Sequence, residues 1–335
     1  NQSKQKMVIG RGLSAIRFSY SDQPFSWHSL KSAVHKLDRV AQGSTFVAVS
    51  RHDVECLEIP WFSEECYRQN VACVLDTIDE AIAKSEAVIA KLKQVRTGML
   101  HDLLSYGLDE HGQLRDPIAH PEQFKDSPLG RIPREWKIEH LLNRITLPEG
   151  QVDPRISPYS EWILIAPDHI ESATGRLIAR KTAKEQGAIS GKYVFGPGDI
   201  VYSKIRPYLR KAVLATESGL CSADMYPLRP NDNVDSTFLL ATVLNEPFSR
   251  FASAVSMRSG FPKINRKELA EFIMPWPSID EQRLVSEKLN TFDAQRNMED
   301  LQLSKLKQLK SGFQDDLLTG RVRVPETIME GAAEA

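Results

Sequence analysis

One stretch of this 335-residue chain occurs twice. Residues 91–104 read KLKQVRTGMLHDLL, and residues 305–318 read KLKQLKSGFQDDLL, with no gap in the match. The second copy starts 214 residues after the first (305 − 91), which is far longer than the ~20–50 residues of a solenoid repeat. The sequence therefore predicts two copies of a whole structural module and a pseudo-twofold molecule, which suits a target with two separated halves.

The segment before each copy is repeated as well. Residues 57–65 read LEIPWFSEE, and residues 272–282 read FIMPWPSIDEQ. Each predicts a strand that ends at a proline, followed by a serine helix cap with acidic residues in the first turn. We therefore expect a long helix after each segment, from about Glu64 to Ser105 and from about Asp280 to Thr319.

Both predicted helices carry apolar residues at heptad spacing, which is typical of a coiled coil. At 1.5 Å per residue each helix is about 60 Å long, and two matched helices in one chain most simply pair with each other, antiparallel. Ser85, Arg96, Arg296 and Glu299 interrupt the seam, and they either fix its register from buried positions or lie at its solvated edge. The residues expected to pair the helices are Val71, Leu75, Ile78, Ile82, Ile89, Leu92, Val285, Leu289, Phe292, Leu303, Leu306 and Phe313.

The remaining sequence predicts an α+β protein with mixed α/β modules. Within the globular part, we expect strand–turn–strand structure at 193–203, as a hairpin or a tight turn, and a helix at 236–252. Because residues 1–62 match only the back half of the later module, we expect about 80 residues of a first module to lie upstream. The predicted parts are a truncated first module (1–62), the first helix (63–106), a linker (107–134), the second module (135–277), the second helix (278–320) and a tail (321–335).

The composition argues against several classes of protein. A net charge of −1 gives no overall nucleic-acid signal, so a basic surface would have to be local. The four cysteines form no CxxC pair and the eight histidines have no metal-binding spacing, so we expect no metal site and a cytoplasmic location. No apolar run approaches the ~20 residues of a membrane span. Residues 187–193 miss the phosphate-binding loop by one residue, and the sequence contains no adenine-methylase or hydrolase motif, so we predict a non-catalytic chain.

The first candidate binding stretch lies at 202–211. On a strand, Tyr202, Lys204 and Arg206 would share one face, and cations interleaved with tyrosine suit phosphate contact and base stacking. An ordinary solvated strand face would explain the same pattern. The candidate DNA-binding residues of this stretch are Tyr202, Ser203, Lys204, Arg206, Tyr208, Arg210 and Lys211.

The second candidate stretch lies at 256–266, which its glycine and proline make a loop. Arg258, Lys263, Asn265 and Arg266 could contact phosphates or base edges, since arginine pairs well with guanine and asparagine with adenine. The alternative is a structural loop that marks the end of the module.

Five short sequence motifs follow one another along the chain. They are GRIPREW at 130–136, GDIVYSKIRPYL at 198–209, GFPKI at 260–264, PWPSIDEQ at 275–282 and DLLTGRVRV at 316–324. In this order, and together with the duplication, they resemble the specificity subunit (HsdS) of type I restriction–modification enzymes. The resemblance covers nearly the whole chain up to Pro325.

That resemblance implies two target recognition domains that each read one half of a bipartite site on double-stranded DNA. The long helices would be spacers that set the distance between the half-sites. They would also dock DNA methyltransferase (modification) subunits, two of them, which carry S-adenosylmethionine, and a restriction subunit would complete the nuclease. The chain itself would bind no cofactor and no membrane, and its short first module leaves the reading of one half-site unassigned.

A function of another class is compatible with the neutral charge and the helix seams. The chain could be a coiled-coil assembly scaffold whose globular modules bind protein, without sequence-specific DNA binding. Enrichment of a split motif from a random DNA pool would distinguish the two.

Overall fold

The computed structural model describes residues 8, 13–19, 21–41, 48–256 and 262–325. The chain divides into two compact units, one combining residues 1–92 with 295–335 and the other formed by residues 93–294. Two long helices run through both units: α3 (Glu65–Ser105) and α7 (Ile279–Thr319). The two helices predicted from the heptads are therefore confirmed, and their bounds lie within one residue of those expected.

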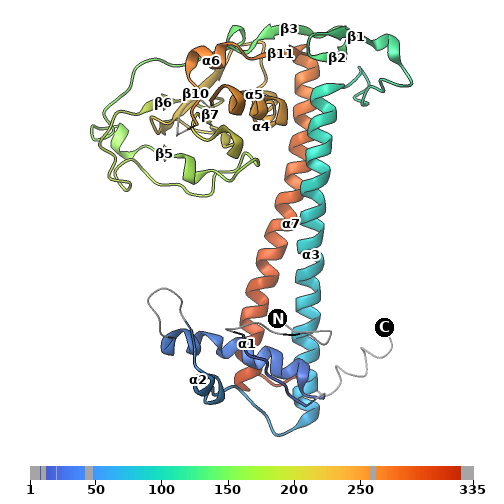
Figure 1. The fold of residues 1–335 in the computed structure, drawn as a ribbon, viewed down its shortest axis with the longest axis vertical. Helices are drawn as coiled ribbons and strands as arrows, with labels where there is room; N and C mark the ends of the chain where they lie inside the picture. The colour runs from blue at the N-terminus through green and yellow to red at the C-terminus, as the bar shows by residue number, and fades with distance from the viewer. Residues whose placement is uncertain (1–7, 9–12, 20, 42–47, 257–261, 326–335) are drawn as a thin grey trace. The chain divides into compact units, whose positions relative to one another are not determined.

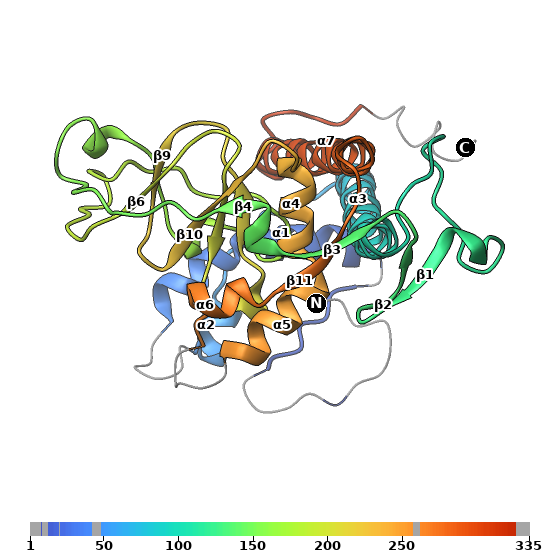
Figure 2. The same ribbon diagram turned by 90° about the horizontal axis from the view of Figure 1, so that it is seen from above.

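Ion pairs show that α3 and α7 pair in antiparallel register, and the two helices lie side by side in both views (Figures 1 and 2). In the second unit, the guanidinium of Arg96 donates two hydrogen bonds to the carboxylate of Asp293, over 2.6 and 2.8 Å. Such a bidentate pair has a defined geometry, so it contributes to register as well as to attraction. The interhelical pairs of the first unit are Asp79–Lys310 and Glu86–Lys307.

Half of the twelve predicted seam residues are buried, and five more are half-buried. Phe313 is the exception, because its side chain is 43% exposed while the next turn packs inward through Leu317 and Leu318. A straight helix drifts by ~20° per heptad relative to a strict seven-residue repeat, so a seam extrapolated from the middle of the helix is wrong at its end. The predicted residues that are buried are Val71, Leu75, Ile82, Ile89, Val285 and Leu289, and those that are half-buried are Ile78, Leu92, Phe292, Leu303 and Leu306.

Two of the four polar interruptions are buried in the seam, and the other two, Arg96 and Glu299, are half-buried. Ser85 is 6% exposed and Arg296 is 2% exposed. Arg296 also lies 3.7 Å from the carboxylate of Asp300, one turn along the same helix. Ser85 and Arg296 therefore occupy buried positions of the kind that can set register, which was one of the two alternatives.

In the first unit, helix α1 (Gln23–Val40) contributes Phe25 to an apolar core that also includes residues of α3 and α7. Arg68 near the start of α3 pairs with Asp22, the N-cap residue of α1, over 2.6 Å. A short helix, α2 (Arg51–Glu55), begins at a capping box formed by Ser50 and Asp53. The start of α3 is therefore held by both apolar packing and a buried ion pair.

The second unit contains two main sheets, with strand orders β4-β10-β7-β8 and β5-β9-β6. Strands β6 and β7 follow each other across residues 196–199 but belong to different sheets, so the predicted strand–turn–strand is present and the hairpin is not. The strands are β4 (Ile145–Thr146), β5 (Leu164–Ile165), β6 (Tyr193–Phe195), β7 (Ile200–Ser203), β8 (Ala212–Leu214), β9 (Gly219–Cys221) and β10 (Met225–Pro230). Two further pairs are β1 (Phe124–Ser127) with β2 (Gly130–Pro133), and β3 (Lys137–His140) with β11 (Ile273–Trp276).

Two helices, α4 (Ser236–Leu244) and α5 (Glu246–Ser256), occupy the region for which a single helix was predicted. The break falls at Asn245, whose side-chain oxygen accepts a hydrogen bond from the backbone N–H of Glu246. Pro247 follows in the first turn of α5, where its missing N–H costs nothing. A short helix α6 (Arg266–Ala270) precedes β11, and the 3₁₀ turns are η1 (Pro121–Gln123), η2 (Leu141–Asn143), η3 (Tyr159–Glu161), η4 (Pro167–His169) and η5 (Pro207–Leu209).

A buried carboxylate connects the predicted linker to α7. Glu281 is 8% exposed, and it accepts hydrogen bonds from Arg115 at 2.5 Å, from the indole N–H of Trp136 at 3.0 Å and from the backbone N–H of Leu108 at 2.9 Å. A Cβ at Gly107, where φ is +66°, would lie 2.1 Å from this carboxylate. The residues that follow α3 are therefore packed into the second unit.

Candidate nucleic-acid interface

Backbone hydrogen bonds join the two basic stretches of the second unit into one surface. The N–H of Arg206 donates to the carbonyl of Pro262 over 2.8 Å, and the N–H of Ile264 donates to the carbonyl of Lys204 over 2.9 Å. Ile205 and Lys263 pair as an isolated antiparallel bridge. Two stretches that are far apart in sequence therefore present their side chains together.

Between β7 and β8 the chain makes the tight turn η5, with a left-handed residue on each side. Arg206 has φ +48° and Arg210 has φ +47°. A left-handed conformation costs a residue other than glycine roughly 1–2 kcal/mol, and such strain persists only where the surrounding structure holds it. Here the carbonyl of Arg210 accepts the N–H of Ala173 over 2.9 Å, and the carbonyl of Pro207 accepts the hydroxyl of Ser249 over 3.4 Å.

The turn and the neighbouring loop bring cations and an aromatic ring to the surface. Arg206 and Lys263 are exposed, Tyr208 is 56% exposed, and Arg210 is half-buried. Guanidinium and ammonium groups contact phosphates, and an exposed tyrosine ring can stack on a base. This set of side chains is the interface that we carry forward.

Lys204 lies beneath this surface. It is 7% exposed, and its ammonium lies 4.7 Å from the centre of the Tyr226 ring. Burial, followed by repulsion from Lys263, lowers the pKa of Lys204. Its charge therefore strengthens the positive potential from below, while the exposed groups make the outermost layer.

Two predicted contact residues belong to the core. Tyr202 is 1% exposed, and its ring packs edge-on against Phe248 with 5.4 Å between the centroids. Ser203 is 2% exposed and donates to the carbonyl of Ile205. Strand β7 ends at Ser203 and is buried on both faces. The prediction that Tyr202, Lys204 and Arg206 share one exposed strand face is therefore wrong.

Three further predicted residues hold the module together with their side chains. Lys211 donates to the carbonyl of Pro167 over 2.6 Å. The side-chain oxygen of Asn265 caps α6 by accepting the N–H of Glu268 over 3.0 Å. Arg266 donates to the carbonyls of residues 147 and 148. Arg258 lies outside the described residues.

No residue type signals the left-handed position in the loop at 171–176 that supports the turn. Ala173 in this loop has φ +61°, and the loop is closed by a hydrogen bond from the N–H of Glu171 to the carbonyl of Arg176, over 3.0 Å. A left-handed position is normally signalled by glycine or asparagine. An alanine there carries no such signal.

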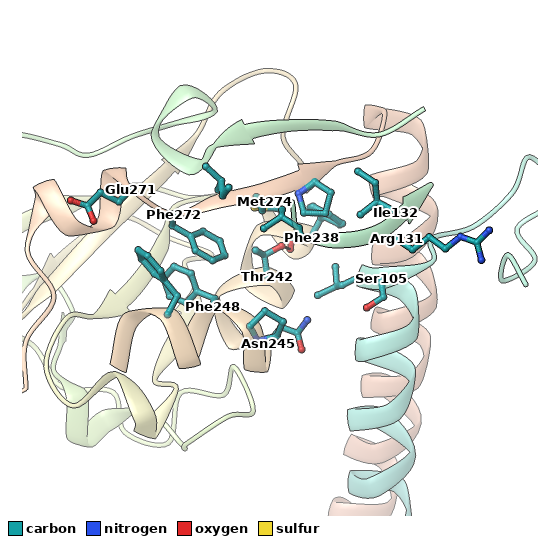
Figure 3. A pocket seen from close by; sticks show the side chains of 16 residues that line it. Ser105, Arg131, Ile132, Phe238, Thr242, Asn245, Phe248, Glu271, Phe272 and Met274 are labelled. Atoms are coloured by element: carbon teal, nitrogen blue, oxygen red, sulfur yellow. Dashed lines mark hydrogen bonds between the residues drawn. The ribbon is translucent and has the colours of Figure 1, made fainter. Parts of the chain in front are cut away.

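An apolar cavity of about 380 Å³ lies elsewhere in the second unit, between the end of α3, the β1–β2 pair, α4, α5 and β11. Figure 3 shows the rings of Phe238, Phe248 and Phe272 around it, while the charged ends of Arg131 and Glu271 point away. Its lining suits apolar packing and offers no cluster of cations for DNA.

The described part of the chain contains no group of three or more His, Cys, Asp or Glu side chains that could hold a metal ion. None of its described helices is both long enough and apolar enough to cross a membrane.

Comparison with known proteins assigns the fold and the family. Residues 171–308 match the family model of the type I restriction modification DNA specificity domain. The type I restriction enzyme EcoDI specificity subunit of Escherichia coli is 30% identical over 278 residues, which cover 78% of this chain and 60% of that protein. The chain carries the DNA specificity domain of type I restriction–modification systems. The resemblance seen in the sequence is therefore confirmed.

Other members of the family agree with this assignment. The type I restriction enzyme MjaVIII specificity subunit of Methanocaldococcus jannaschii is 23% identical over 321 residues, or 90% of this chain and 71% of that protein. The S subunit of a type I restriction–modification system from M. genitalium, known from a crystal structure, shares the fold with a TM-score of 0.55 over 88% of this chain and 72% of its own, at 17% identity. The mixed helix and sheet fold with two long helices is thus that of an HsdS subunit.

Proposed function

We propose that this chain is the DNA-recognition subunit of a type I restriction–modification complex. The module at 135–277 binds one half of a bipartite site on double-stranded DNA. Helices α3 and α7 act as the spacer, and they dock two modification subunits and a restriction subunit. Related proteins bear the name of specificity subunits of type I restriction enzymes, which supports this division of labour.

The observation that carries the proposal is the joining of the two basic stretches through Arg206, Pro262, Lys204 and Ile264. A chain whose net charge is −1 gains a local positive surface only if its cations are gathered in one place. The fold gathers them at a rigid turn and a neighbouring loop, where an aromatic ring is also exposed. This combination is what contact with a nucleic-acid backbone requires.

The chemistry of these groups supports a binding role and not a catalytic one. Arginine and lysine on an exposed surface hold phosphate oxygens as permanent cations, whereas proton transfer calls for groups that titrate near neutral pH. In the proposal, methyl transfer therefore belongs to the modification subunit with its S-adenosylmethionine, and this chain selects the DNA site.

The proposal is tested by DNA binding of the complex with its modification subunits. The double variant Arg206→Ala, Lys263→Ala should weaken binding to all sequences alike and reduce the slope of log K against log salt by about 2, one for each phosphate contact. Lys137→Ala, an exposed lysine on β3 of the same module, is the matched control and should bind as the parent does. Equal affinity and slope for the double variant would remove this surface from the interface.

A further inference from the structure

We infer that the turn from Arg206 to Arg210 is a preformed grip for one stretch of phosphodiester backbone, in which both arginines are held in left-handed conformations at the expense of stability. This inference rests on the proposed DNA-binding function, and it adds Arg210 and the strained backbone of the turn to the phosphate contact proposed there for Arg206. It also assigns to the loop at 171–176 the role of supporting the turn.

The strain in the described residues converges on this one place. Ala173, Arg206 and Arg210 are the non-glycine residues with positive φ in the described ranges. Ala173 donates its N–H to the carbonyl of Arg210 over 2.9 Å, and Arg206 donates its N–H to the carbonyl of Pro262 over 2.8 Å. The three strained residues are thus parts of one hydrogen-bonded structure, as is common where strain serves binding.

The residue type at the two strained positions indicates what the strain serves. Glycine adopts positive φ without a steric penalty, whereas arginine does not. A turn selected for its backbone alone would therefore carry glycine at 206 and 210. Arginine supplies a permanent charge and a planar fork of N–H groups that matches two phosphate oxygens.

The surroundings hold the turn rigid before any ligand arrives. Pro207 restricts its own φ, and its carbonyl accepts the hydroxyl of Ser249 on α5. On the other side, the loop at 171–176 packs on α4 so closely that a Cβ at Gly175 would lie 3.1 Å from Leu240. A group that is fixed in advance loses less conformational freedom on binding, which suits a grip. Because phosphate contacts carry no sequence information, the turn grips DNA and leaves base reading to other residues.

Glycine substitutions give the inference a distinctive test, since they remove a cation while relieving strain. Arg206→Gly and Arg210→Gly should each leave the melting temperature of the chain unchanged or raise it by up to about 4 °C. In complex with the modification subunits, each should bind every DNA sequence more weakly, with the salt slope reduced by about 1. Affinity is expected to fall while stability is kept or raised, which a merely structural role would not produce.

Two controls separate the backbone from the side chain. Ala173→Gly relieves the same kind of strain without removing a charge, so it should keep the parental salt slope. Arg206→Lys keeps the charge and the strain, so it should retain the salt slope that Arg206→Gly loses. A fall in melting temperature for the two arginine-to-glycine variants, or parental affinity and slope in both, would overturn the grip while the proposed function stands. A parental complex that binds no DNA would overturn both.

Discussion

The backbone N–H of Arg206 donates a hydrogen bond to the carbonyl oxygen of Pro262 over 2.8 Å. Through this bond, a left-handed residue at the end of one basic stretch is attached to the loop that carries the other. The candidate interface is therefore a property of the fold of the second unit, since neither stretch alone gathers the exposed Arg206, Tyr208 and Lys263. Four consequences of the structure can be measured.

Replacing Lys204 with Met should stabilise the chain at neutral pH, because a buried ammonium would be exchanged for an apolar side chain of similar length. Burial lowers the pKa of Lys204 in the folded chain below its ordinary value of 10.5. At a pH between the lowered pKa of the folded chain and the ordinary pKa of the unfolded chain, the unfolded chain binds more protons than the folded one. The free energy of unfolding therefore rises with pH across that window. Denaturant midpoints measured from pH 7 to 10 should show this rise in the parent and lack it in Lys204→Met. Lys137→Met is the exposed control. Identical pH profiles of stability for the parent and Lys204→Met would contradict the lowered pKa of Lys204.

Replacing Glu281 with Gln should destabilise the second unit by about 3 kcal/mol. Removing one charge of a buried, hydrogen-bonded pair leaves the other charge uncompensated, and here the cation left behind is Arg115. Urea denaturation measures the loss. Glu287→Gln, at an exposed position on the same helix, should change stability by less than about 0.5 kcal/mol, and equal effects of the two variants would count against the buried bridge.

The pair between Arg96 and Asp293 should contribute to stability through direct coupling. Its side chains are 11% and 32% exposed, so water screens the pair less than it screens a surface pair. A double-mutant cycle with Arg96→Met and Asp293→Ala should give a coupling free energy of about 1 kcal/mol. The exposed pair Glu80–Lys84, at 80% and 73% side-chain exposure for the lysine and the glutamate, should give about 0.3 kcal/mol in the same assay. Coupling that is no larger for the interhelical pair would mean that it does not set the register.

Filling the apolar cavity should stabilise the second unit. Thr242 lines the cavity, and its hydroxyl is bonded only within its own helix, to the carbonyl of Phe238. Thr242→Ile adds apolar surface to the lining and should raise the free energy of unfolding by about 1 kcal/mol. Thr237→Ile, outside the lining on the same helix, is the comparison, and a loss of stability in Thr242→Ile alone would show that the cavity does not accept added volume.

The sequence predicted the parts of this fold that depend on periodicity. The heptads located α3 and α7 because burial along a seam repeats every seven residues, and they failed at Phe313, where the helix drifts out of that repeat. The single helix predicted at 236–252 is broken because Asn245 caps a new helix through its side chain. The spacing of apolar residues contains no information on such a local hydrogen bond.

The candidate site was harder to predict because it depends on conformations that its residues do not signal. Tyr202 and Arg206 look equivalent on an ideal strand, yet Tyr202 is in the core and Arg206 follows the end of the strand. Asparagine is a residue type that can bind a base edge, but the side-chain oxygen of Asn265 caps α6. Lys263 and Arg206 are among the predicted residues and both are exposed, but their attachment through Pro262 is a tertiary contact that no local pattern contains.

The most direct test of the central claim is selection of DNA from a random-sequence pool by the complex of this chain with its modification subunits. The proposal predicts enrichment of a motif split into two short blocks by a gap of constant length, and loss of that enrichment when Arg206 and Lys263 are both replaced by Ala. A pool that stays random with the parental complex, at low salt and at physiological salt alike, would contradict it.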